Sequence, residues 1–330
     1  MRARAIYNEL RRMFPVNWEM NRAYRLPTGN IAQPYYIAWS AAPRPRGEGW
    51  SHASFDENGV LITNGFLNPV SISQFALYHY ARAVAGEGIS RARFIAQADH
   101  LVRVQRADGA YPYPKPLPAY GAPAGWLSGM AQGEVASVLL RAFALTGAPQ
   151  YRAYALQALQ PLCVDVAEGG ASYLRNGSVF FEEVATLDPC HILNGHLYAA
   201  FAMWECSHFG IGGDTIRTLH HDAVHTLERW LPQYDALGWS YYDLAVDSIG
   251  RRHQAPLWYH QFHIAQLRVY TAMTGRELFA KIADRWQHAL DRRDVRARVW
   301  RYAAESLLNA VRRRATRAPV TTFSPLPIEP

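Results

Sequence analysis

One arrangement repeats along the middle of the chain: an apolar segment with helical spacing, a stop that contains glycine, and a more polar segment with helical spacing. The repeats occupy residues 71–105, 130–166, 191–232 and 259–290. Glycine beside the last apolar residue is a common helix stop. Within each pair the more apolar helix is expected to be the more buried one. About four such helical hairpins predict an all-α fold, an (α/α) toroid with the apolar helices inside.

The chain divides by composition into three predicted parts. Residues 1–70 are punctuated by proline and glycine, and the β-rich stretches QPYYIAWS and GVLITNGF within them are expected to pair as a short N-terminal β-hairpin. Residues 71–292 form the toroid. Residues 293–330 contain a C-terminal helix and a Pro-rich tail beyond Arg314, which is expected to be disordered or loosely strapped to the surface.

Long segments separate the hairpins, at residues 107–126, 166–190 and 232–259. Loops of this length are uncommon in compact domains unless they carry function. The last one runs into PLWYHQFHIAQL, which crowds aromatic and histidine side chains at the start of a helix. This stretch is therefore either an aromatic patch of the core or the floor of a site.

The charge of the chain favours an anionic partner. Its formal net charge is +7, almost all from arginine, because Lys115 and Lys281 are the only lysines. A basic surface attracts nucleic acid, an acidic membrane face or an acidic polysaccharide. The arginines form no long basic run, so a nucleic-acid partner is not expected, whereas a homodimer stays among the expectations.

Compartment and cofactors are judged from what the sequence contains. Three cysteines are too few for a disulfide scaffold and fit a reducing compartment. The N-terminus lacks the apolar stretch of a signal peptide, and no run is long enough to span a bilayer, so we expect a cytoplasmic protein. His221 and His225 have the spacing of a metal pair, but no third ligand is evident, so no metal is expected.

Several blocks, in the right order, resemble the D-glucuronyl C5-epimerases. NPVSISQFALYHYA resembles the first-helix block of that family, GWLSGMAQGEVASVLLRAF its Gly-Trp-Tyr-Ser-Ala-Met-Ala-Gln-Gly block, and FFEEVATLDPCHILNGHLYA its Glu-Glu-Tyr…Leu-Asn-Gly block. SYYDL and WYHQFHIAQL resemble its Tyr-Asp-Leu-Arg-His and Tyr-His-Thr-Thr-His-Ile-Asn-Gln-Leu blocks. The resemblance covers about residues 65–292. It implies a helical catalytic domain that epimerises a uronate of a polysaccharide at C5, of the D-glucuronate to L-iduronate type, without a metal or redox cofactor.

The resemblance also implies which residues act. Tyr242, Tyr259 and Glu183 match positions that the family ties to activity. The family tyrosine after the second glutamate is Val184 here, and Ala245-Val246 replaces its Arg-His. Either the remaining trio suffices, or the substrate is another uronate, or the reaction has shifted to β-elimination. His191 is the predicted replacement for the missing hydroxyl, because imidazole gives and takes protons near neutrality.

Abstraction of a proton next to a carboxylate needs a group on each face of the sugar ring and partners for the growing negative charge. A tyrosine of ordinary pKa, about 10, needs nearby cations to act as a base. Arg251, Arg252, His253, His260 and His263 are close to the tyrosines in sequence. The predicted substrate-binding residues are Trp126, Gln132, Asn194, Arg251, Arg252, His260 and His263.

Each of these residues also has a purely structural interpretation. The two tyrosines and Trp126 could be packing residues, His260 and His263 satisfied core histidines, and Glu182-Glu183 a solvated acidic pair. His191 could be a solvent-exposed histidine at the start of a helix, and Asn194-Gly195 a device for close helix packing. Three other functions stay open: a polysaccharide lyase, an inactive glycan-binding homologue, or a glycoside hydrolase. A hydrolase needs two carboxylates, and only Glu183 with Asp243 or Asp188 offers them.

Overall fold

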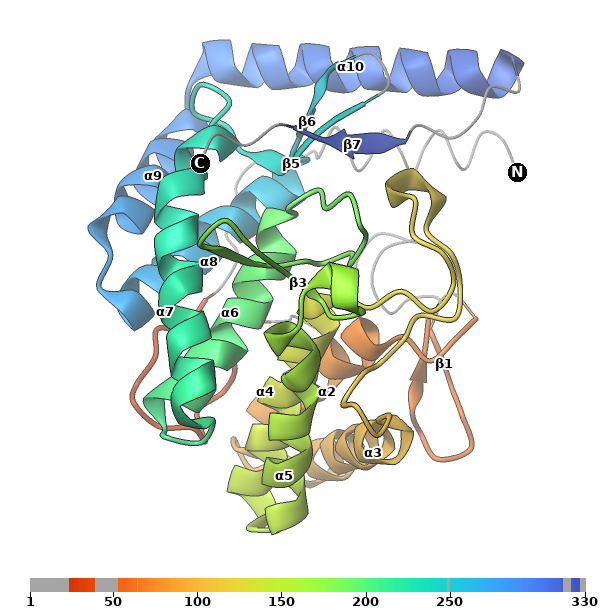
Figure 1. The fold of residues 1–330 in the computed structure, drawn as a ribbon, viewed down its shortest axis with the longest axis vertical. Coiled ribbons are helices and arrows are strands. Elements are labelled where there is room, and N and C mark those ends of the chain that lie inside the picture. Colours follow the sequence, from red (N-terminus) through yellow and green to blue (C-terminus); the bar gives the residue numbers. More distant parts are fainter. Residues whose placement is uncertain (1–23, 39–52, 64, 248–249, 317–321, 327–330) are drawn as a thin grey trace.

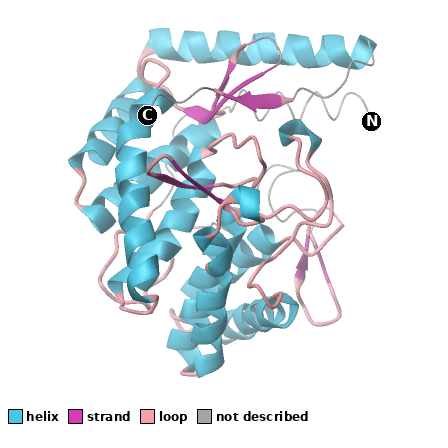
Figure 2. Ribbon diagram, in the orientation of Figure 1, coloured by secondary structure: helices cyan, strands magenta, loops and turns pink. Residues whose placement is uncertain are grey.

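The computed structural model describes residues 24–38, 53–63, 65–247, 250–316 and 322–326. This part of the chain is mainly helical, with a few short strands (Figures 1 and 2). The helices are α2 (Pro69–Ala83), α3 (Gly88–Val104), α4 (Gly129–Thr146), α5 (Pro149–Ala158), α6 (Leu193–His208), α7 (Gly213–Trp230), α8 (Leu257–Thr274), α9 (Glu277–Ala289) and α10 (Arg293–Thr316). The mainly helical fold and its four successive hairpins are as predicted.

Local sequence explains where the helices begin and end. Asn68 caps α2, because its side chain accepts hydrogen bonds from the backbone N–H groups of Val70 and Ser71. Gly147 ends α4 with φ +72°, a left-handed conformation that favours glycine. The second helix of that hairpin is shorter than predicted: α5 stops at Ala158 and a 3₁₀ turn follows, since Pro161 lacks the N–H that an α-helix requires.

The first helices of the hairpins pack in chain order: α2 on α4, α4 on α6, and α6 on α8. They are also the more buried, with the whole run from Gly129 to Ala142 buried in α4. The backbones of α4 and α6 approach so closely that a Cβ added at Gly133 would lie 2.5 Å from the Cα of Ala199. Glycine is therefore required where these two helices cross.

A buried ion pair ties the N-terminal segment to these helices. Arg141 of α4 contacts Glu205 of α6 at 2.8 Å, and both side chains are fully buried. The guanidinium also lies over the rings of Tyr35 and Tyr36. These tyrosines belong to the same hydrophobic core as the helices, so the described part of residues 24–38 packs on the helical array rather than apart from it.

A short N-terminal hairpin is present, but it is not the one that was predicted. Strand β2 (Leu61–Ile62) pairs with β1 (Ser54–Phe55), whereas Ile37 forms a bridge with Tyr24. The expected pairing of QPYYIAWS with GVLITNGF is thus wrong for its described residues; residues 39 and 40 lie outside them. Asp56 accepts hydrogen bonds from the N–H groups of Asn58 and Val60. This tight turn folds the chain back, so β2 pairs with β1, the strand immediately before it in sequence.

Two small sheets lie beside the helices. In one, β3 (Ser172–Arg175) pairs with β4 (Ser178–Phe181). In the other, β5 (Tyr241–Asp247) is the central strand between β6 (Arg252–Gln254) and β7 (Phe323–Pro325). Helix α10 runs along this second sheet (Figure 1). Among the described residues, no helix has the length and apolar character required to cross a bilayer.

The described part of the C-terminal tail differs from expectation. Residues 322–326 are not a disordered or loosely attached segment, because β7 pairs antiparallel with β5, with Val246 opposite Ser324. The N–H of Leu326 also donates to the carbonyl of Leu244, at 3.0 Å. The edge of β5 that faces away from β6 offers free backbone groups, and these hold the C-terminal segment in place. The Pro/Thr-rich composition of the tail did not indicate this pairing.

Candidate active site

Three residues predicted to be catalytic meet at one place, although they come from different elements. Glu183 lies just after β4, Tyr242 in β5 and Tyr259 in the first turn of α8. The hydroxyl of Tyr242 donates to Oε1 of Glu183 at 3.4 Å. The rings of Tyr242 and Tyr259 touch edge to face, with centroids 4.7 Å apart. One carboxyl and two phenols therefore form a compact cluster.

Glu183 is held by the start of α6. The side-chain amide of Asn194 donates to Oε2 of Glu183 at 2.9 Å. A Cβ added at Gly195 would lie 2.3 Å from the Cβ of Glu183, so the carboxylate side chain occupies the space that glycine leaves. Asn194-Gly195 thus does serve close packing, as one interpretation expected, and the packed group is the candidate acid or base itself.

The pKa of Glu183 is raised from its ordinary value to about 7. Burial is the largest cause, and the negative charges of Asp243 and Glu182 add to it. Hydrogen bonds from Asn194 and Tyr242 act in the opposite direction, because they stabilise the ionised form. A carboxyl that titrates near neutrality can both take and return a proton, as general acid–base catalysis requires.

Tyr242 is a neutral hydrogen-bond donor in this arrangement. Its pKa is raised well above the ordinary value, by burial first and then by the negative charge of Glu183. The expected stabilisation of a phenolate by arginines is not observed. Arg251 pairs with Asp247 at 3.0 Å, and Arg252 lies over the ring of Tyr241, 3.9 Å from its centroid. The two arginines are therefore engaged elsewhere.

His260 is a core residue, contrary to the prediction that it binds substrate. It is fully buried, it stacks on Trp239, and its Nδ1 lies 2.9 Å from Oγ of Ser240 while Nε2 faces the carbonyl of Trp286. Burial lowers its pKa to about 3, so the ring is neutral. The structural interpretation, a satisfied core histidine, holds for this residue.

His263 is different, because it borders the tyrosine cluster. Its Nδ1 also faces Oγ of Ser240 at 2.9 Å, and its ring stacks on that of Tyr242 with centroids 6.5 Å apart. Its Nε2 is buried and has no hydrogen-bond partner among the described residues. Burial lowers the pKa of His263 well below its ordinary value. The ring is therefore neutral, and it packs against Tyr242 in that form.

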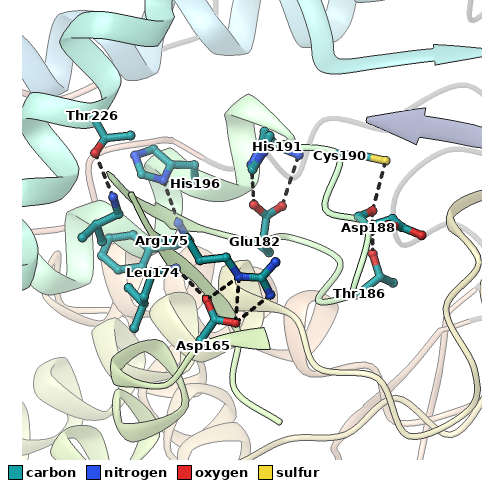
Figure 3. Close-up of polar contacts among 12 residues, drawn as sticks. Asp165, Leu174, Arg175, Glu182, Thr186, Asp188, Cys190, His191, His196 and Thr226 are labelled. Carbon is teal, nitrogen blue, oxygen red and sulfur yellow. Dashed lines mark hydrogen bonds and ion pairs between the residues drawn. The ribbon is translucent and has the colours of Figure 1, made fainter. Parts of the chain in front are cut away.

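His191 does not lie beside Glu183 as predicted. Its Nδ1 lies 2.6 Å from Oε1 of Glu182, and its backbone N–H donates to the other oxygen of the same carboxylate (Figure 3). The ring packs against those of Tyr173, Phe180 and Trp230. The carboxyl group that His191 meets is therefore that of Glu182, not that of Glu183 as predicted.

Two predicted substrate contacts have different surroundings. Gln132 is fully buried and bonds only to backbone, donating to Gly109 and Ala158 and accepting from Tyr111, so it anchors a loop and cannot meet substrate. Trp126 is half-buried and stacks face to face on Tyr113, with centroids 4.1 Å apart. It packs against the tyrosine cluster, which keeps it a candidate sugar platform.

Val184 lies inside the same cluster. It packs with Ala122, Ile192, Tyr242 and Ala255 in a small apolar group, with Tyr259 at its margin. The position at which the family pattern has a tyrosine therefore borders both remaining tyrosines. Because valine stands where the family pattern has a tyrosine, this group has one hydroxyl fewer, although Val184 itself still packs within it.

Sequence reasoning named Asp243 and His253 separately but did not foresee their pairing, and it missed Glu134. Asp243 is fully buried and accepts from the hydroxyl of Tyr120 at 3.2 Å, while its Oδ2 lies 3.1 Å from Nδ1 of His253. Glu134 of α4 is buried near Glu183, and its pKa is raised well above the ordinary value, by burial first. An aspartate and a histidine on neighbouring strands were the signal for the first, whereas a glutamate inside an apolar helix was the signal for the second.

Metal ligation receives no support from the part of the chain that the structure describes, which contains no group of three or more His, Cys, Asp or Glu suited to a metal ion. His221 and His225 lie on the exposed side of α7 and contact each other.

The fold and the site define a protein of helical hairpins in which the carboxyl of Glu183 lies together with two tyrosines, Tyr242 and Tyr259. Residues 107–288 match the family described as the D-glucuronyl C5-epimerase C-terminus, and the chain belongs to this family. It is 30% identical over 209 residues to the D-glucuronyl C5-epimerase of Caenorhabditis elegans, covering 58% of this chain and 34% of that protein. It is also 29% identical over 175 residues to an uncharacterized protein of Methanocaldococcus jannaschii, covering 52% of this chain and 54% of that one. The chain thus spans about a third and about half of the length of these curated relatives.

Proposed function

We propose that this protein is a C5-epimerase of uronate residues in an anionic polysaccharide or its precursor, of the D-glucuronate to L-iduronate type. The observation that carries the proposal is the contact between Tyr242 and Glu183, whose carboxyl has a pKa of about 7. Membership of the epimerase family supports the reaction class. The substrate is inferred from chemistry, since a uronate has an acidic C5–H beside a carboxylate.

In the proposed mechanism, ionised Glu183 removes the proton from C5 of the sugar. The electron pair of that C–H bond moves into the substrate carboxylate, which becomes an enolate-like dianion. Tyr259 then donates its hydroxyl proton to C5 from the opposite face, and solvent restores the two side chains. Tyr242 keeps its proton and donates a hydrogen bond to Glu183, which fixes the direction of the carboxylate.

The proposal includes an architecture for substrate binding. The first helices of the four hairpins form the inner row of an (α/α) toroid, and the polysaccharide lies across the cluster of Glu183, Tyr242 and Tyr259. Trp126 offers a half-exposed aromatic face to a neighbouring sugar. Three further predictions from the sequence are kept as part of this proposal. They are the domain boundaries at residues 70 and 292, a homodimer and a cytoplasmic location.

The test is incubation of the protein in D₂O with polymers that contain glucuronate, mannuronate or galacturonate, one at a time. Deuterium at C5 without chain cleavage is the expected result for at least one polymer. Absorbance from unsaturated chain ends would identify a lyase, and new reducing ends alone would identify a hydrolase. Binding without any chemical change would identify a glycan-binding homologue. This outcome is included because Val184 replaces a tyrosine of the family pattern.

A further inference from the structure

A uronate carries its own negative charge into a region that already contains the half-buried carboxyl of Glu183 and the buried carboxyls of Glu134 and Asp243. Charge on the substrate carboxylate grows further when the C5 proton leaves. A hydrogen-bond donor aimed at that carboxylate is therefore needed both to admit the sugar and to stabilise the reaction.

Most of the cationic side chains close to the tyrosines in sequence are used elsewhere. Arg251 pairs with Asp247, and Arg252 donates to the carbonyl of Gln233 at 2.8 Å. His260 and His263 have no solvent exposure. The two arginines contact other residues and the two histidines are enclosed, so among the described contacts none of these four side chains combines solvent exposure with a contact to Tyr242.

His253 is the fifth, and it has the required position. Its ring contacts that of Tyr242, with centroids 5.0 Å apart, and its side chain is 26% exposed. Its Nδ1 is fixed by Oδ2 of Asp243 at 3.1 Å. When both ring nitrogens carry protons, Nδ1–H donates to Asp243 and Nε2–H remains for a second carboxylate.

The partners of His253 are themselves held in place. Asp243 is fully buried and receives hydrogen bonds from the hydroxyl of Tyr120 and the N–H of Ala245. Phe323 of β7 stacks on the ring of His253, with centroids 4.9 Å apart and planes inclined by 14°. The same phenylalanine stacks on Tyr120, so three segments distant in sequence fix one imidazole.

We propose that His253, oriented by Asp243 and backed by Phe323, binds the carboxylate of the uronate. The proposal rests on the proposed function and names the residue that recognises the acid group of the substrate. In this view Phe323 and Asp243 are positioning residues, and the C-terminal strand β7 helps to build the site.

The experiment measures equilibrium binding rather than turnover. The probes are a polymer of alternating glucuronate and N-acetylglucosamine and the same polymer with its carboxyl groups reduced to hydroxymethyl groups. Wild-type protein should bind the uronate polymer at least about tenfold more tightly, as expected for a charge-assisted hydrogen bond. His253→Gln should lose most of this preference while its affinity for the reduced polymer stays unchanged, and Phe323→Ala should lose part of it.

His221→Gln is the matched control, because His221 also faces an aspartate, Asp222 at 3.1 Å, but on the exposed side of α7. It should bind like the wild type. The inference is overturned if His253→Gln keeps the full preference, or if the wild type has none. Binding also separates this inference from the proposed function: a preference that depends on His253 without deuterium at C5 would refute only the epimerase, and deuterium with an unaffected preference would refute only the role of His253.

Discussion

Tyr242 donates a hydrogen bond to Glu183, at 3.4 Å, across 59 positions of sequence. The contact joins a phenol whose pKa is raised well above the ordinary value to a carboxyl whose pKa is raised to about 7. The proton therefore stays on the phenol, and the carboxyl is the member of the pair that changes charge near neutrality. In the proposed mechanism, this relationship makes Glu183 the base and Tyr242 the fixed donor.

Glu183→Gln should lower the rate of C5 exchange by at least about a hundredfold, the lower range for a general acid–base group. The amide has the shape of the carboxyl but cannot accept the C5 proton, so the fold should persist. The measurement is deuterium incorporation in D₂O, beside a thermal unfolding curve. Glu228→Gln is the control, since Glu228 pairs with Arg276 on the outer side of α7 and should leave the rate unchanged. A fully active Glu183→Gln would remove this residue from the mechanism.

The pH dependence of kcat/KM should follow the titration of Glu183. The ionised form is the base, so the rate rises with pH and levels off above about 7, the raised pKa. Glu183→Gln should keep its residual rate but lose this limb. Ordinary carboxyls titrate below pH 5. A wild-type rate that does not change between pH 5 and 8 would therefore contradict a base with a raised pKa.

The same titration predicts a change in stability with the opposite sign. Between the ordinary pKa of 4.5 and about 7, the folded protein keeps a proton on Glu183 that the unfolded chain releases. The free energy of unfolding therefore falls as pH rises through this interval. Chemical denaturation at several pH values should show a smaller fall in Glu183→Gln, and equal slopes for the two proteins would contradict the raised pKa.

Tyr259→Phe should abolish turnover and leave the fold intact, and Tyr242→Phe should lower the rate by at least about a hundredfold. Tyr259 is half-buried at the start of α8, so loss of its hydroxyl disturbs little of the core. Tyr154→Phe, a half-buried tyrosine of α5, is the matched control. Unchanged deuterium incorporation in Tyr259→Phe would show that another group protonates the second face.

His191→Ala should act on stability, which revises the catalytic role that the sequence suggested. Removal of the ring leaves the buried carboxylate of Glu182 without its partner at 2.6 Å and opens space among three aromatic rings. The expected cost is at least about 2 kcal/mol of unfolding free energy. His288→Ala, an exposed histidine of α9, should cost almost nothing. A stable but inactive His191→Ala would restore the catalytic interpretation.

The sequence was sufficient for the parts of this protein that depend on local patterns. Apolar spacing and glycine stops predicted the helical hairpins, because these signals act within a few residues. The ordered family blocks pointed to Glu183, Tyr242 and Tyr259, which do meet. Strand pairing was less predictable, since β5 and β7 lie far apart in sequence and no local pattern marks them as partners.

The direction of a side chain was the other limit of prediction. His191, Glu182 and Glu183 lie in one segment, and no local sequence pattern distinguishes which of the two neighbouring carboxyls the histidine meets. Gln132 and His260 sit within motifs that border the site, yet both face the core. A motif fixes which residue types are near one another, whereas packing decides which of them faces the substrate.

Gly195→Ala tests how closely α6 positions Glu183. The added methyl carbon would lie 2.3 Å from Cβ and 2.5 Å from Oε2 of Glu183, well inside contact distance, so the carboxylate must move. Its hydrogen bond from Asn194 would be strained or lost, and a displacement of about 1 Å can lower a rate roughly a hundredfold. Stability should fall by about 1–3 kcal/mol from overpacking, partly offset by the better helix propensity of alanine.

Gly88→Ala, in the first turn of α3 with nothing within 4 Å, is the control and should keep full activity. The measurement is deuterium exchange at C5 together with unfolding in urea. An active and stable Gly195→Ala would mean that Glu183 adopts another position during catalysis.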